Sequence, residues 1–112
     1  MSQEVALTPY LHVRVLKNQS MYIFRCPGCS ELPDYFGPPV HVYYTEMGDR
    51  GWQFNGNNEL PSFTPSLKNT YHDGRVCHLF ITDGKIHYCD DCWHSLKGKT
   101  VDMPIMSYKS EE

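Results

Sequence analysis

Glycine and proline occur so often along this chain that no long helix fits between them. The 112 residues include eight of each, and the segments between them are rich in β-branched and aromatic residues. This pattern is typical of short strands joined by turns. We expect strands over residues 10–17, 20–26, 40–46 and 52–56. The sequence therefore predicts a mainly β fold with little helix, either a small antiparallel sheet or a partly open barrel.

The clearest hairpin signal is Asp83-Gly84 between two apolar runs. This dipeptide favours a two-residue type I′ turn, because both turn positions need a positive φ. The predicted pairs are Thr82 with Lys85, Ile81 with Ile86, Phe80 with His87, Leu79 with Tyr88 and His78 with Cys89. Since successive strand residues point to opposite faces, Cys77 is expected on the apolar face, opposite to His78. Those two neighbours should then not bind one metal unless a bulge intervenes.

Several other segments are less regular. A proline interrupts residues 63–71, which indicates an edge strand or an extended loop. The proline-rich insert 30–39 is expected to be a loop, and 47–51 a turn. Residues 95–104 should contain a short helical turn or loop and then a strand, and 107–112 are expected to be frayed.

Length and charge restrict the class of protein. A chain of 112 residues suffices for one domain, so we expect a single domain over 1–112 with an ordered core of about 8–106. The net charge is −3, from 10 basic and 13 acidic residues without a basic cluster. Nucleic-acid binding needs a one-sided basic face and is therefore not favoured. We see no secretory signal and no apolar run near the roughly 18 residues that span a bilayer. The sequence thus predicts a cytoplasmic protein without membrane contact.

Cysteine and histidine spacing indicates a metal site. Cys26-Pro-Gly-Cys29 has the form of a metal knuckle, and a second set follows far along the chain in Cys89-x-x-Cys92 and His94. In a cytoplasmic protein such pairs are more often metal ligands than disulfides. We therefore predict one structural Zn²⁺, with Fe²⁺ or Co²⁺ as alternatives, that clips the sheet between Cys26–Cys29 and the 92–94 segment.

The sequence leaves open which four ligands bind. The candidate metal ligands are Cys26, Cys29, His41, Cys77, His78, Cys92 and His94. Cys77 and His41 are also compatible with plain structural roles, and Cys89 with a thiol that only faces His78. A catalytic site would need an open metal position, with Asp90 or Asp91 as a base and His78 as a proton shuttle. No nucleophile–base pair or phosphate loop is evident, so no catalytic residue is predicted.

The ordered motifs between residues 24 and 104 resemble a family of small uncharacterised phage and prophage proteins. The motifs include Cys26-Pro-Gly-Cys29, Trp52, Pro65-Ser66, Cys77-His78, Asp91-Cys92 and His94. Genomes often mislabel that family as ammonia monooxygenase, a label that does not fit a chain without a membrane span. The resemblance implies recurring positions at the seven candidate ligands. Cys89 departs from it, since relatives are apolar there, and the insert before His41 is longer than usual.

The resemblance and the composition lead to an expected function. We expect a metal-binding phage accessory protein that binds a host protein in the host cytoplasm, such as an anti-CRISPR-like inhibitor of host defence. The first alternative is a metal-dependent hydrolase or nuclease with an open zinc site around His78, Asp91 and His94. The second is a nucleic-acid-binding zinc module. A homodimer through exposed strand edges is compatible with either.

Overall fold

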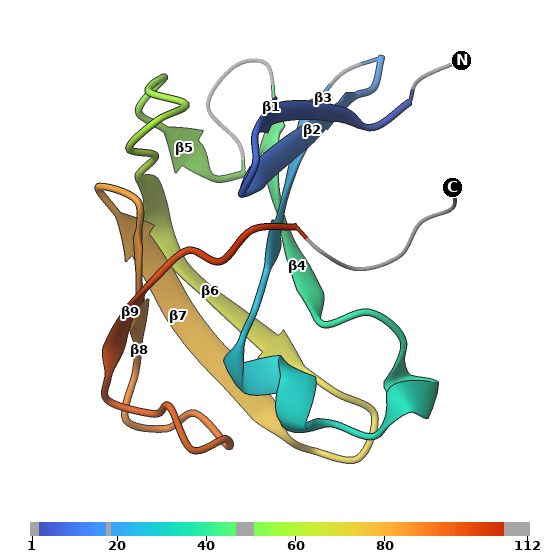
Figure 1. The fold of residues 1–112 in the computed structure, drawn as a ribbon, viewed down its shortest axis with the longest axis vertical. Helices are drawn as coiled ribbons and strands as arrows, with labels where there is room; N and C mark the ends of the chain where they lie inside the picture. The colour runs from blue at the N-terminus through green and yellow to red at the C-terminus, as the bar shows by residue number, and fades with distance from the viewer. Residues whose placement is uncertain (1–2, 18, 47–50, 107–112) are drawn as a thin grey trace.

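The computed structural model describes residues 3–17, 19–46 and 51–106, and within these ranges the strands form two antiparallel sheets (Figure 1). The first sheet has the order β1-β2-β3-β4 and the second the order β5-β6-β7-β8-β9. The strands are β1 Val5–Thr8, β2 Leu11–Val15, β3 Gln19–Arg25, β4 Val40–Glu46, β5 Gln53–Phe54, β6 Phe63–Thr70, β7 Val76–Thr82, β8 Lys85–Tyr88 and β9 Thr100–Asp102. The predicted mainly β fold is confirmed, and the described strands do not close into a barrel.

Most expected strands are present, and one strand was not expected. The four predicted first correspond to β2, β3, β4 and β5. β1 was missed because only one of its four residues is buried, so the sequence carries little alternation there. It forms instead by pairing with β2, with Val5 opposite Val13 and Ala6 opposite His12.

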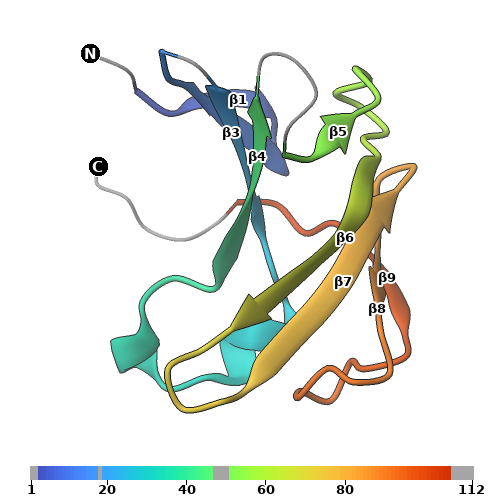
Figure 2. The ribbon, with the colours of Figure 1, turned by 180° about the vertical axis from the view of Figure 1, so that it is seen from behind.

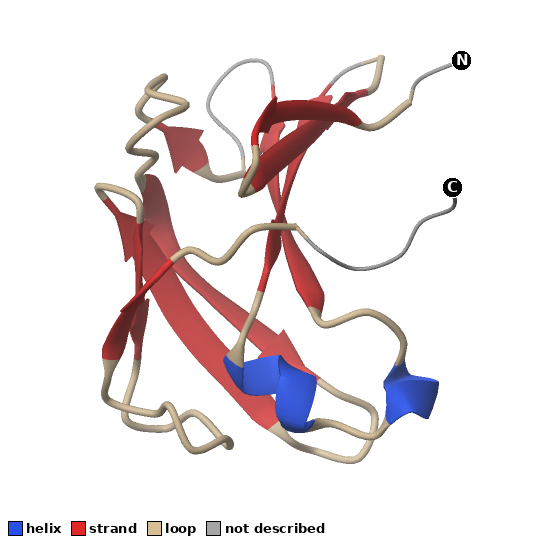
Figure 3. Ribbon diagram, viewed as in Figure 1, coloured by secondary structure: helices blue, strands red, loops and turns tan. Residues whose placement is uncertain are grey.

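The insert between β3 and β4 is not the plain loop that its prolines indicated. It contains two short 3₁₀ helices, η1 Gly28–Glu31 and η2 Asp34–Phe36, drawn in blue in Figure 3. Pro27 and Pro33 precede them with φ of −63° and −58°, the values that the proline ring imposes and that suit the start of a helical turn. Proline thus starts each of these turns.

The β7–β8 hairpin has the predicted register. Thr82 pairs with Lys85 and Leu79 with Tyr88, and the turn residues Asp83 and Gly84 have φ of 51° and 77°. The face assignment also holds, because the side chains expected inside are buried: Cys77, Leu79, Ile81, Ile86 and Tyr88. The strand expected after the hairpin is β9, which pairs with β8.

Stacked aromatic rings join the two sheets. Tyr43 from β4 and Phe63 from β6 are fully buried, with ring centroids 4.2 Å apart and planes within 4°. Phe54 and Tyr22 add to the stack, with centroids 4.8 and 5.5 Å from Phe63. Burial of such rings is the main favourable term in the packing of a small domain, so these contacts fix how β4 faces β6.

β6 is irregular where the sequence has its proline. β5 covers only Phe63 and Thr64, and further along, the side of β6 away from β7 lacks a strand partner among the described strands (Figure 2). The β6–β7 ladder shifts between Phe63 and Leu67, and the Thr64–Pro65 peptide is cis. The predicted edge character therefore applies to the second half of β6.

The expected turn at 47–51 lies mostly outside the described residues, since 47–50 are not described. The tail 107–112, expected to be frayed, lies outside them entirely. Among the residues that are described, no helix combines the length and the apolar character that a membrane crossing needs.

Candidate metal centre and candidate catalytic triad

The first half of the metal centre is the turn at the end of β3. Cys26 follows the strand and Cys29 lies in η1, so the 3₁₀ turn brings both thiols to the inside. The backbone N–H of Cys29 donates to Cys26 Sγ at 3.4 Å. Both residues are buried, with exposed fractions of 0% and 1%.

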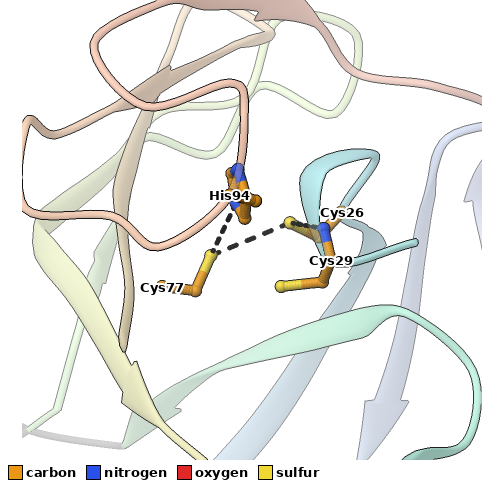
Figure 4. Close-up of side chains that lie close together, drawn as sticks. All are labelled: Cys26, Cys29, Cys77 and His94. Carbon is orange, nitrogen blue, oxygen red and sulfur yellow. Dashed lines mark hydrogen bonds between the residues drawn. The ribbon is translucent and has the colours of Figure 1, made fainter. Parts of the chain in front are cut away.

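The second half comes from the other sheet. Cys77 of β7 and His94, in the loop after β8, point at the knuckle from across the core (Figure 4). One ligand atom from each of Cys26, Cys29, Cys77 and His94 lies within 4.8 Å of the others. The Cys26 and Cys77 sulfurs are 3.9 Å apart, and Cys77 Sγ is 3.4 Å from His94 Nε2. Three thiols and one imidazole form a donor set that suits a tetrahedral soft metal, so this cluster can hold a metal ion.

The three thiols shift one another's pKa values. Burial raises the pKa of the Cys26 thiol to about 12. Hydrogen bonds with Cys26 and Cys77 lower the pKa of Cys29, and hydrogen bonds with Cys26 and Cys29 raise that of Cys77. A bound cation would stabilise all three as thiolates.

Two further predicted ligands lie beside the four. His41 Nε2 is 3.4 Å from Cys29 Sγ, and Cys92 Sγ is 3.2 Å from His94 Nε2. The Tyr71 hydroxyl also donates to Cys29, at 3.0 Å. Both His41 and Cys92 are buried but outside the set of four. Cys77 is in the set of four and Cys92 is not; Cys77 is on the buried face of β7.

Gly28 allows His94 to reach the cluster. A Cβ at this position would lie 2.0 Å from His94 Cε1, which is far inside contact distance. We expect Gly28→Ala to displace the imidazole, to weaken metal binding at least about tenfold and to lower the free energy of unfolding by about 1–3 kcal/mol. Metal analysis and thermal denaturation test this. Lys97→Ala, at an exposed position in the loop that carries His94, should leave both unchanged, and normal metal content in Gly28→Ala would contradict the assignment of His94.

His78, the remaining predicted ligand, belongs to a different constellation. Its Nε2 is 2.9 Å from the Ser66 hydroxyl, and its Nδ1 is 2.9 and 3.1 Å from the two carboxylate oxygens of Asp91. A serine, a histidine and an aspartate thus form one hydrogen-bonded series. These are the contacts and the order of a catalytic triad.

The hydrogen bonds also define the proton positions. A carboxylate can only accept, so the ring N–H must be on Nδ1 of His78. In the neutral imidazole Nε2 is then an acceptor, and the Ser66 hydroxyl donates to it. The hydrogen bond from His78 lowers the pKa of Asp91, so that Asp91 is a carboxylate at neutral pH.

The second sheet positions all three side chains. Lys68 pairs with His78, which places Ser66, two residues earlier on β6, on the same face as the imidazole. The Trp52 indole N–H donates to the Ser66 carbonyl at 3.2 Å, and the Cys89 backbone N–H donates to the His78 carbonyl at 2.9 Å. Asp91 follows in the loop after β8.

The two sites share their supporting segments. Cys77 and His78 are consecutive in β7 and point to opposite faces, while Asp91 and His94 lie in one loop. The metal cluster is on the core side, and the side chains of His78 and Asp91 are 24% and 53% exposed. A metal ion at the core cluster would therefore hold the segments from which the triad projects.

Sequence reasoning named Ser66 only within the Pro65-Ser66 motif of the resemblance and assigned it no role. His78 and Asp91 were considered as a shuttle and a base, but only around an open metal site that also included His94, which the structure places in the buried cluster. The triad residues are spaced by 12 and 13 positions and carry no local signature such as a nucleophile elbow. A serine next to proline in an irregular strand was the sole local signal.

Comparison with protein families finds one match. Residues 4–89 match the model described as bacterial ubiquitination-like system serine protease (BubE). The match covers well over half of the 112 residues, including Ser66 and His78, and ends before Asp91 and His94. Comparisons with curated proteins and with solved structures find no match. The chain therefore belongs to the family described as bacterial ubiquitination-like system serine protease (BubE).

Proposed function

We propose that this protein is a serine protease in which Ser66 is the nucleophile, His78 the general base and Asp91 the group that orients the imidazole. The observation that carries the proposal is the continuous series of hydrogen bonds from Ser66 Oγ through both nitrogens of His78 to Asp91. The family description supports the same reaction class.

The reaction follows from the proton positions. As Ser66 Oγ attacks a carbonyl carbon, its proton moves to Nε2 of His78, and the Asp91 carboxylate stabilises the imidazolium. The amine leaves with that proton and an acyl ester remains on Ser66. Water, deprotonated by His78, then hydrolyses the ester and regenerates the hydroxyl.

A groove lined in part by Trp52, which contacts the Ser66 backbone, suits a polypeptide substrate. It has a volume of ≈ 410 Å³ and lies between β4 and the uncovered half of β6, lined in part by Val42, Trp52 and Lys68. Uncovered strands present unpaired N–H and C=O groups to an extended chain. Trp52 connects the groove to Ser66. In a ubiquitination-like system, the substrate would be a protein linked through a peptide-type amide bond.

We propose further that the core cluster holds one structural Zn²⁺. Four protein donors leave no open position, which is typical of a structural rather than a catalytic ion. The ion would supply no chemistry to the reaction. It would tie η1 and β7 to the loop that carries Asp91.

An active-site-directed fluorophosphonate tests the proposed nucleophile, because it forms a stable adduct only with an activated serine. We expect one adduct, at Ser66, located by mass spectrometry. Ser66→Ala should not react, whereas Ser20→Ala, on β3 of the other sheet, should react like the wild type. Labelling that persists in Ser66→Ala, or that never occurs in the folded protein, would rule out this mechanism.

The role expected from the phage resemblance stays a prediction. In that role, a phage protein in the host cytoplasm binds a host protein and inhibits host defence. A pull-down from host lysate with Ser66→Ala, which would retain substrates and partners alike, is the measurement that would test it.

A further inference from the structure

Cys89 is the one cysteine that is not buried. Four of the five cysteines are buried, whereas Cys89 is partly exposed. It follows β8 on the outer face of the second sheet, and its N–H donates to the His78 carbonyl at 2.9 Å. This places a sulfur beside the triad rather than beside the core ion.

The sulfur completes a second set of metal donors. One ligand atom from each of His78, Cys89 and Asp91 lies within 4.8 Å of the other two. An imidazole, a thiol and a carboxylate are the three donor types that zinc accepts. Three protein donors and a free fourth position form an open site, unlike the closed set in the core.

The local charge favours a cation. The carboxylates of Asp90 and Asp91 lie close enough to Cys89 to raise its pKa, after the larger effect of burial. A divalent ion would neutralise Asp91 and replace the thiol proton. Because these groups are partly exposed, the ion can reach them from solvent.

We propose that His78, Cys89 and Asp91 form a regulatory site for a soft divalent cation such as Zn²⁺, which inhibits the enzyme by capturing two members of the triad. This inference depends on the proposed serine mechanism. Nδ1 is the nitrogen of His78 that faces Asp91, and an ion bound there takes the place of the Nδ1 proton, which moves to Nε2. His78 then has no free lone pair on Nε2 and can no longer accept the proton of Ser66. Inhibition is reversible, since chelation of the outer ion restores the triad.

The test uses full-length protein with its core site loaded, titrated with Zn²⁺. Wild type should bind one further ion and lose fluorophosphonate labelling in parallel. Cys89→Ser should keep its basal labelling but need at least about tenfold more Zn²⁺ for the same loss. His87→Gln, on the same sheet face two residues earlier, is the matched control and should behave like wild type.

Calorimetry with Ser66→Ala measures the same binding without any reaction. A second ion that binds Ser66→Ala and is lost in the double variant with Cys89→Ser supports the site even if no hydrolysis is found, in which case only the proposed function fails. If wild type with its core site loaded binds no further ion, or if inhibition is unchanged in Cys89→Ser, the inference is overturned. Activation by the second ion would overturn it as well, because the metal would then be catalytic.

Discussion

Ser66→Ala is expected to lower kcat/KM for the protein substrate by about 10⁴- to 10⁶-fold, the range found when the nucleophile of a serine triad is removed. The Ser66 hydroxyl is the only group in the series that can form the acyl bond, and His78 has no function without it. The measurement is single-turnover cleavage of a conjugate, with circular dichroism to confirm that the variant is folded.

The neighbouring carboxylates provide a sharper comparison. Asp91→Asn should lower kcat by about 10⁴-fold, because an amide neither holds the Nδ1–H tautomer nor stabilises the imidazolium. Asp90→Asn also removes one negative charge, one residue earlier, but leaves the contact between Asp91 and His78 in place. This variant should retain nearly full activity. Equal losses in the two variants would show that net charge matters and that Asp91 has no specific role.

Removal of the metal ion that we propose at the core cluster is expected to unfold the protein. Structural Zn²⁺ contributes about 10–16 kcal/mol in small peptides, which equals or exceeds the total stability of about 5–15 kcal/mol of a typical domain. Without the ion, three buried thiols and the His94 imidazole lie within a few ångströms, and burial lowers the pKa of that imidazole. A strong chelator should therefore abolish the thermal transition followed by circular dichroism.

Variants separate the core ion from the outer one. Cys77→Ser removes a buried donor and should reproduce the effect of the chelator, whereas Cys89→Ser should melt like the wild type. Activity should disappear together with the fold in Cys77→Ser, because the segments that carry His78 and Asp91 are the ones that the proposed ion would hold. A chelated protein with an unchanged melting temperature would show that the cluster is a set of packed thiols without a structural ion.

Local patterns predicted the features that depend on neighbouring residues. The register of the β7–β8 hairpin follows from Asp83-Gly84 and from strict alternation, so the separation of Cys77 from His78 could be stated in advance. The short 3₁₀ turns of the insert were missed, since a proline that begins a helical turn and a proline within an irregular loop look alike in sequence.

By itself, the sequence determined the mainly β class, the hairpin and its two faces, and the residue types of a soft-metal site, because turn chemistry and side-chain alternation act over a few residues. Only the tertiary structure decided that Cys77 joins the knuckle and that Ser66, His78 and Asp91 meet. Those contacts depend on the register of β6 against β7 and on the course of the loop after β8. Both are set by long-range pairing and by the burial of Leu67, Leu79 and the aromatic stack, which no local pattern encodes.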